Sequence, residues 1–96
     1  MAISTERIVT ILGFMYGYKA EVVIDISKNK CYLFVGIKNQ FELNYEEVDC
    51  LVCNEIIELD GGCGEKGHET EIYILTDLAQ EKIKLILKDK KLIQLN

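Results

Sequence analysis

The spacing between apolar residues changes along the first half of the chain, and this change constrains the fold more than any other feature. Residues 4–17 place apolar side chains every three or four positions, which predicts a helix with one buried stripe. From residue 21 the spacing becomes two, which is typical of strands. The helical stripe comprises Ile8, Ile11, Leu12 and Met15; the alternating residues are Val22, Ile24 and Ile26, then Cys31, Leu33, Val35 and Ile37. We therefore expect a helix followed by a hairpin that turns at residues 27–30.

Polar residues at the start of segments suggest the elements that come next. Residues 41–43 extend the sheet briefly, and Asn44 with Glu47 three residues later predicts a capping box that begins a second helix. We expect this helix to end near Asn54. A similar capping box at Asp77 and Gln80 predicts a third helix. The buried stripe expected of this third helix is Ala79, Ile83, Ile86 and Leu87.

Between the second and third helices the pattern predicts a second hairpin. Residues 56–59 and 72–75 are predicted to be strands, and residues 60–70 form a glycine-rich loop between them. Residues 92–95 are interpreted as a short closing strand. The expected order is helix, hairpin, helix, hairpin, helix.

Length and composition indicate one domain spanning residues 1–96. Apolar residues make up 49% of the 96 residues and charged residues 28%, as in ordinary globular proteins. The predicted fold class is α+β. Residues 8–18 are too short and too interrupted to cross a bilayer, and no secretory signal is evident, so a cytoplasmic protein with no membrane contact is expected.

Two segments of the second half resemble a winged-helix domain. Val48, Leu51 and Val52 followed by residues 54–58 are similar to a recognition helix turning into the first wing strand, with Glu55 at the place of the usual small residue. Residues 73–76 leading into 77–83 are similar to the second wing strand and the helix after it. The resemblance covers residues 45–87 and implies a winged-helix-like second half. It does not extend to the first half, where that family has two further helices.

Charge opposes the DNA binding that this resemblance implies. Residues 42–81 hold twelve acidic residues and one basic residue, Lys66. DNA affinity depends largely on Lys and Arg displacing condensed counterions, so we do not expect direct DNA binding through this region. The acids fit either a solvated face or a surface that docks a basic protein. The candidate partner-binding residues are Glu46, Glu47, Asp49, Glu55, Glu58 and Asp60.

A cluster of cysteines and the only histidine offers an alternative. Cys50, Cys53, Cys63 and His68 are spaced so that they could give zinc a tetrahedral Cys3His ligand set that braces the loop. They are also explained as incidental thiols and a loop histidine. No nucleophile, base and orienting group can be assembled from the pattern, so the protein is not expected to be an enzyme.

The leading hypothesis is a small acidic protein-binding module that needs no cofactor. It would act as an inhibitor or adaptor on a basic protein, including a nucleic-acid-binding protein. In size and charge the chain resembles small acidic inhibitors encoded by mobile elements. Two alternatives stay open: a winged-helix DNA-binding regulator that uses its lysine-rich residues 82–91 or a homodimer surface, and a zinc-stabilised structural module.

Overall fold

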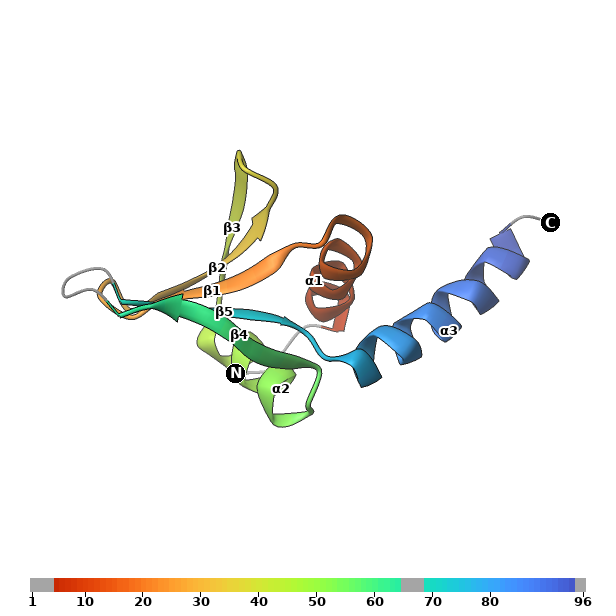
Figure 1. Cartoon of the computed structure of the whole chain (residues 1–96). Helices are drawn as coiled ribbons and strands as arrows, with labels where there is room; N and C mark the ends of the chain where they lie inside the picture. Colours follow the sequence, from red (N-terminus) through yellow and green to blue (C-terminus); the bar gives the residue numbers. More distant parts are fainter. Residues whose placement is uncertain (1–4, 65–68, 95–96) are drawn as a thin grey trace.

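The computed structural model of the chain describes residues 5–64 and 69–94, and these residues form three helices and five strands (Figure 1). In chain order the elements are α1 (Thr5–Tyr18), β1 (Glu21–Asp25), β2 (Lys30–Val35), β3 (Asn39–Leu43), α2 (Tyr45–Cys53), β4 (Ile57–Cys63), β5 (Thr70–Leu75) and α3 (Asp77–Gln94). All five strands join one antiparallel sheet in the order β3-β2-β1-β5-β4. The α+β class is therefore confirmed.

The sheet joins the two halves of the sequence. Strands β1, β2 and β3 form a meander, and α2 then connects the edge strand β3 to the opposite edge strand β4. Strand β5 lies between β4 and the central strand β1, and it pairs with β1. The expected order had two separate hairpins, with residues 41–43 extending the sheet briefly; the structure has a full third strand, β3, at this position and a single sheet that joins both hairpins. Long-range pairing of β1 with β5 decides this, and no local pattern reports such pairing.

Local chemistry sets the limits of α2 where the sequence predicted them. Asn44 is extended, and Asn44 and Glu47 form the capping box, with the Asn44 N–H donating to Oε1 of Glu47 at 2.9 Å. The helix ends at Asn54, and Glu55 then adopts the left-handed conformation at φ 58°. This conformation explains why a small residue is usual at the position of Glu55.

Several predicted limits are wrong. Strand β4 continues to Cys63, so it takes up the start of the predicted loop, while Ile26 and Ile37 lie in turns rather than strands. Helix α3 continues through Gln94 where a closing strand was predicted, because residues 77–94 contain no glycine or proline to stop it.

The cap of α3 also differs from the predicted Asp77–Gln80 capping box. Thr76 caps this helix instead, since its Oγ1 accepts the Ala79 N–H at 3.1 Å. The sequence pattern therefore placed this helix start one residue too late.

The two faces of the sheet have different surroundings. Residues that alternate along a strand point to opposite faces, and directly paired residues share one face. We call the face that packs against α1 and α2 the covered face; its buried residues are Val22, Cys31, Leu33, Leu43, Ile57 and Leu75. Ile11 and Met15 of α1 and Val48 and Leu51 of α2 complete this core.

The opposite side of the sheet is the open face, on which neither of these two helices packs. Its apolar residues are half-buried: Val23, Tyr32, Phe34, Ile72 and Ile74. Among the described residues, no helix combines the length and the apolar character needed to cross a membrane.

Candidate protein-binding surfaces

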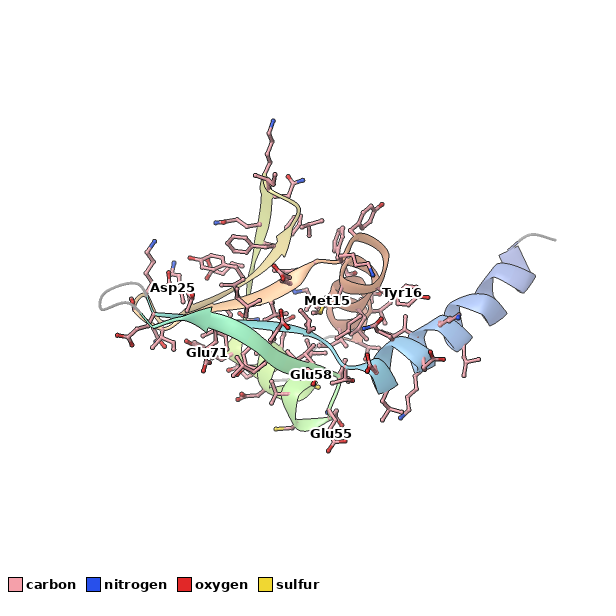
Figure 2. The ribbon with its side chains drawn as sticks, viewed as in Figure 1. Met15, Tyr16, Asp25, Glu55, Glu58 and Glu71 are labelled. Atoms are coloured by element: carbon pink, nitrogen blue, oxygen red, sulfur yellow. The ribbon has the colours of Figure 1, made fainter. Side chains whose placement is uncertain are left out.

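Three of the six predicted partner-binding acids lie along the outer side of α2. Glu46 and Asp49 are exposed and one helical turn apart, so they share a side of the helix. Glu55 follows in the exposed turn that leads to β4, as Figure 2 shows. Two partly exposed residues of this helix, Tyr45 and Val52, accompany the charges: Tyr45 precedes Glu46, and Val52 lies between Asp49 and Glu55. We call these five residues the α2 surface.

Glu47 has a different environment from the other predicted acids. It is 3% exposed, and its carboxylate accepts from Nε of Arg7 at 2.8 Å and from the Asn44 N–H at 2.9 Å. A further Arg7 nitrogen donates to the Glu42 carbonyl at 2.9 Å. The bond from Arg7 holds the pKa of Glu47 below its usual value, against the opposing effect of burial. Glu47 therefore joins α1 to the start of α2 and offers no free surface to a partner.

The sequence pattern indicated the capping role of Glu47 but not its ion pair. The capping box identified Glu47 as a residue that turns back on its own helix. Its ion pair joins positions separated by 40 residues, so no local pattern could reveal Arg7.

The other two predicted acids lie elsewhere on the molecule. Glu58 pairs with Ile74 and points to the open face, whereas Asp60 is exposed at the register shift between Leu59 and Gly61. The predicted acids therefore do not form one continuous surface. The structure divides them between the α2 surface, the open face and the end of β4.

The predicted zinc ligands fall partly within the described side chains. Cys50 is half-buried and Cys53 exposed, both on α2, while the side chain of Cys63 and the whole of His68 lie outside the described residues. No three His, Cys, Asp or Glu side chains among those described are placed to hold a metal ion. The zinc alternative stays a hypothesis. The remaining cysteine, Cys31, is buried, and this burial raises the pKa of its thiol.

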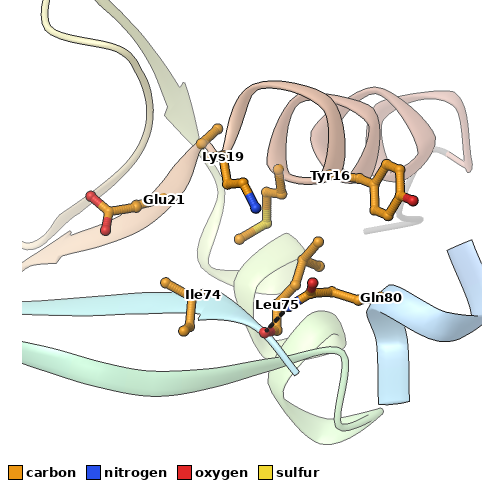
Figure 3. Close-up of a pocket in the computed structure, with 8 residues that line it drawn as sticks. Tyr16, Lys19, Glu21, Ile74, Leu75 and Gln80 are labelled. Carbon is orange, nitrogen blue, oxygen red and sulfur yellow. Dashed lines mark hydrogen bonds between the residues drawn. The ribbon is translucent and has the colours of Figure 1, made fainter. Parts of the chain in front are cut away.

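A cavity of about 500 Å³ lies where α1, β1, β5 and the start of α3 meet. Figure 3 shows Lys19 and Glu21 on one side and Ile74 and Leu75 on the other, with Gln80 directed at the Leu75 carbonyl at 3.4 Å. This lining provides an ammonium and a carboxylate but no serine, threonine or cysteine beside a base.

Comparison with known proteins adds no relationship to this geometry. No protein-family model matches the chain, and neither the curated proteins nor the solved structures include a match to it. Function is therefore inferred from the surfaces of the fold described above.

Proposed function

We propose that the chain is a small acidic protein-binding module of the cytoplasm, which docks a basic protein through the α2 surface. The observation that carries this proposal is the charge of that surface. Glu46, Asp49 and Glu55 are exposed, and none of them takes part in an ion pair among the described side chains of residues 5–62, 64 and 69–85. These carboxylates are free to meet the cations of a partner.

The chemistry of the α2 surface favours a protein over a duplex. Exposed carboxylates accelerate encounter with a basic surface and repel phosphates, because both effects follow the sign of the charge. Tyr45 and Val52 add apolar area, and tyrosine is a common anchor at the centre of protein interfaces. A module of this kind would inhibit a nucleic-acid-binding protein by covering its basic surface, or would link it to another protein as an adaptor.

The second candidate function is a DNA-binding regulator in which residues 45–87 are winged-helix-like. What supports it is the order α2, β4, β5, α3, which matches a recognition helix, a two-stranded wing and a following helix. Exposed Lys82 and Lys84 on α3 favour a DNA-binding regulator that uses α3 rather than α2. A mobility shift on duplex DNA at low salt separates the two. The leading proposal expects no shift, and a shift abolished by Lys82→Glu and Lys84→Glu would favour the regulator.

The direct test uses the immobilised chain to retain proteins from a lysate of its native source. The variant Glu46→Lys with Asp49→Lys should lose the basic protein retained by the unmodified chain. Glu47 is left unchanged because it is buried. The matched control, Glu6→Lys with Glu69→Lys, alters the net charge equally at exposed positions away from α2 and should keep the partner.

Calorimetric titration with the purified partner then gives the loss in affinity. We expect at least about a tenfold loss for the α2 variant, and a weaker association at higher salt. Equal losses in both variants would mean that net charge alone attracts the partner. Retention by the α2 variant would overturn the proposal.

A further inference from the structure

The open face of the sheet has an apolar centre, as do sheet faces that pack against another layer. Its half-buried residues form a row across β2, β1 and β5, from Phe34 and Tyr32 through Val23 to Ile72, and the Tyr32 and Phe34 rings pack edge to face at 6.1 Å. Strands that are apolar on both faces are typical of sheets with a layer on each side. Among the described residues, helices pack against one side of the sheet only.

Charged residues surround this apolar row. Four carboxylates belong to the open face by their register, and the ammonium of Lys30 is the one basic group that the strands add to it. The four acids are Glu21, Asp25, Glu42 and Glu58. The face therefore has a net of three negative charges around an apolar centre, and it fits a cationic, partly apolar occupant.

Helix α3 is basic and partly apolar, which is the character expected of an occupant of the open face. Residues 82–94 contain five lysines and one aspartate. Near its start, exposed Lys82 lies on the same side as Leu78 and Leu85, which are 56% and 62% exposed. This side is turned away from Ala79 and Ile83, the residues that attach α3 to the core. It offers two apolar side chains, the ammonium of Lys82 and the carboxylate of Glu81 to a second surface, while the five lysines against three acids of residues 77–94 make α3 as a whole basic.

Helix α3 projects from the sheet, and Leu78, Lys82 and Leu85 on its outer side are exposed. Figure 1 shows α3 leading away from the sheet and from the other helices. Helices gain most of their stability from tertiary packing of an apolar side, so a projecting helix gains from a partner surface. Its 18 residues extend about 27 Å, enough to cross a five-stranded sheet that is about 19 Å wide.

The start of α3 prevents the helix from turning onto its own open face. One residue, Thr76, separates β5 from α3, and its hydroxyl donates to the Glu55 carbonyl at 2.8 Å. Its N–H donates to the Ile56 carbonyl at 2.9 Å. These bonds, with Ala79 buried in the core, fix the direction in which the helix leaves the sheet.

We propose that the chain forms a homodimer in which α3 of each copy lies on the open face of the other. The arrangement is reciprocal, so a twofold axis pairs both helices with both faces. It adds the missing second layer to each sheet and places Lys82 among the acids. The α2 surface stays free, so the dimer and the docking of a basic protein are independent.

Light scattering coupled to gel filtration, over a concentration series up to about 100 µM, tests the dimer. The face variant, Glu21→Lys with Glu58→Lys, and the helix variant, Lys82→Glu with Lys84→Glu, should each raise the dimer Kd at least about tenfold. Combining all four changes restores the charge match and should return the Kd to within about threefold of the unmodified value.

Apolar contacts are tested by Leu85→Ser, which should also weaken the dimer at least about tenfold, whereas the matched change Val9→Ser at an exposed position of α1 should leave it intact. Circular dichroism verifies that each variant is folded. A chain that is monomeric at about 100 µM in low salt overturns the proposal. So does a dimer whose Kd is unchanged by both the face and the helix variants, or one that the combined variant fails to restore.

Discussion

The covered and open faces of the sheet contain similar residues in different surroundings. Val22 and Val23 are neighbours on β1, but Val22 is 0% exposed beneath the helices while Val23 is half-buried on the open face. Leu33 and Tyr32 show the same contrast on β2. Apolar character therefore does not distinguish the faces. What distinguishes them is the pair of helices that the chain places on one side.

The ion pairs of the two faces also differ in how far their side chains are exposed to solvent. Arg7 and Glu47 meet at 2.8 Å between the covering helices, and the Glu47 side chain is 4% exposed. Lys30 and Glu42 are 3.8 Å apart on the open face, and both side chains are at least half exposed. The first pair fixes the packing of helices, and the second is a surface contact that solvent screens. Each contrast gives a matched experiment.

The largest effect is expected for the two valines. Val22→Ala removes two methyl groups from the core and should lower the free energy of unfolding by about 2 to 3 kcal/mol. Val23→Ala should cost less than about 1 kcal/mol, since the side chain retains contact with solvent. Urea unfolding at low protein concentration measures both. Equal losses would show that the open face is covered as completely as the other face.

The next effect concerns the buried carboxylate. Arg7→Met should destabilise the fold by about 2 kcal/mol, because Glu47 would lose its charged partner while remaining buried. Lys30→Met, the control on the open face, should change the stability by less than about 0.5 kcal/mol. Thermal or urea unfolding distinguishes them. A negligible effect of Arg7→Met would mean that Glu47 does not depend on this pair.

The pH dependence of stability should reveal the same carboxylate. Because the folded state lowers the pKa of Glu47, its contribution is present above the pKa of the unfolded chain and is lost as the pH falls through the lower folded pKa. In Glu47→Gln this part of the acid destabilisation should be absent. Urea unfolding from about pH 6 to about pH 2 measures the slope. Equal slopes would contradict the assignment.

Cysteine reactivity compares the covered face with the exposed surface without changing the stability of the fold. Cys31 on the covered face should react with a thiol reagent at least about a hundredfold more slowly than exposed Cys53, because it must wait for local opening and its pKa is raised. Timed alkylation followed by peptide mass spectrometry assigns each rate. Similar rates for the two thiols would show that α2 opens readily above the sheet.

The zinc hypothesis can be examined with the same protein. Metal analysis after purification without a chelator should find no stoichiometric zinc if the four candidates are ordinary side chains. One zinc per chain that is lost in Cys63→Ser would instead support the alternative.

Features of the fold that depend on neighbouring residues were predicted better than features that depend on contacts between distant residues. The Asn44–Glu47 capping box fixed the start of α2, since both partners lie within one helical turn. The cap at Thr76 was missed because Asp77 offered an equally plausible cap from sequence alone. The third strand gave only a weak signal, since Phe41 and Leu43 are all that alternates there.

The candidate surface was predicted less well than the elements that carry it. Six acids were grouped because they are close in sequence. Glu47 is instead buried by α1, and Glu58 is turned to the open face by the pleat of β4. The aromatic residues of β2, Tyr32 and Phe34, are half-buried on a face that these two helices leave uncovered.

By itself the sequence determined the α+β class, the limits of α2 and the concentration of negative charge, because periodicity, capping and composition act within a few residues. Only the tertiary structure decided that one sheet unites both halves, that Arg7 neutralises Glu47, and that α1 and α2 cover the same face. Those outcomes depend on contacts between residues about forty positions apart, such as Arg7 and Glu47, which are decided by packing of the whole chain.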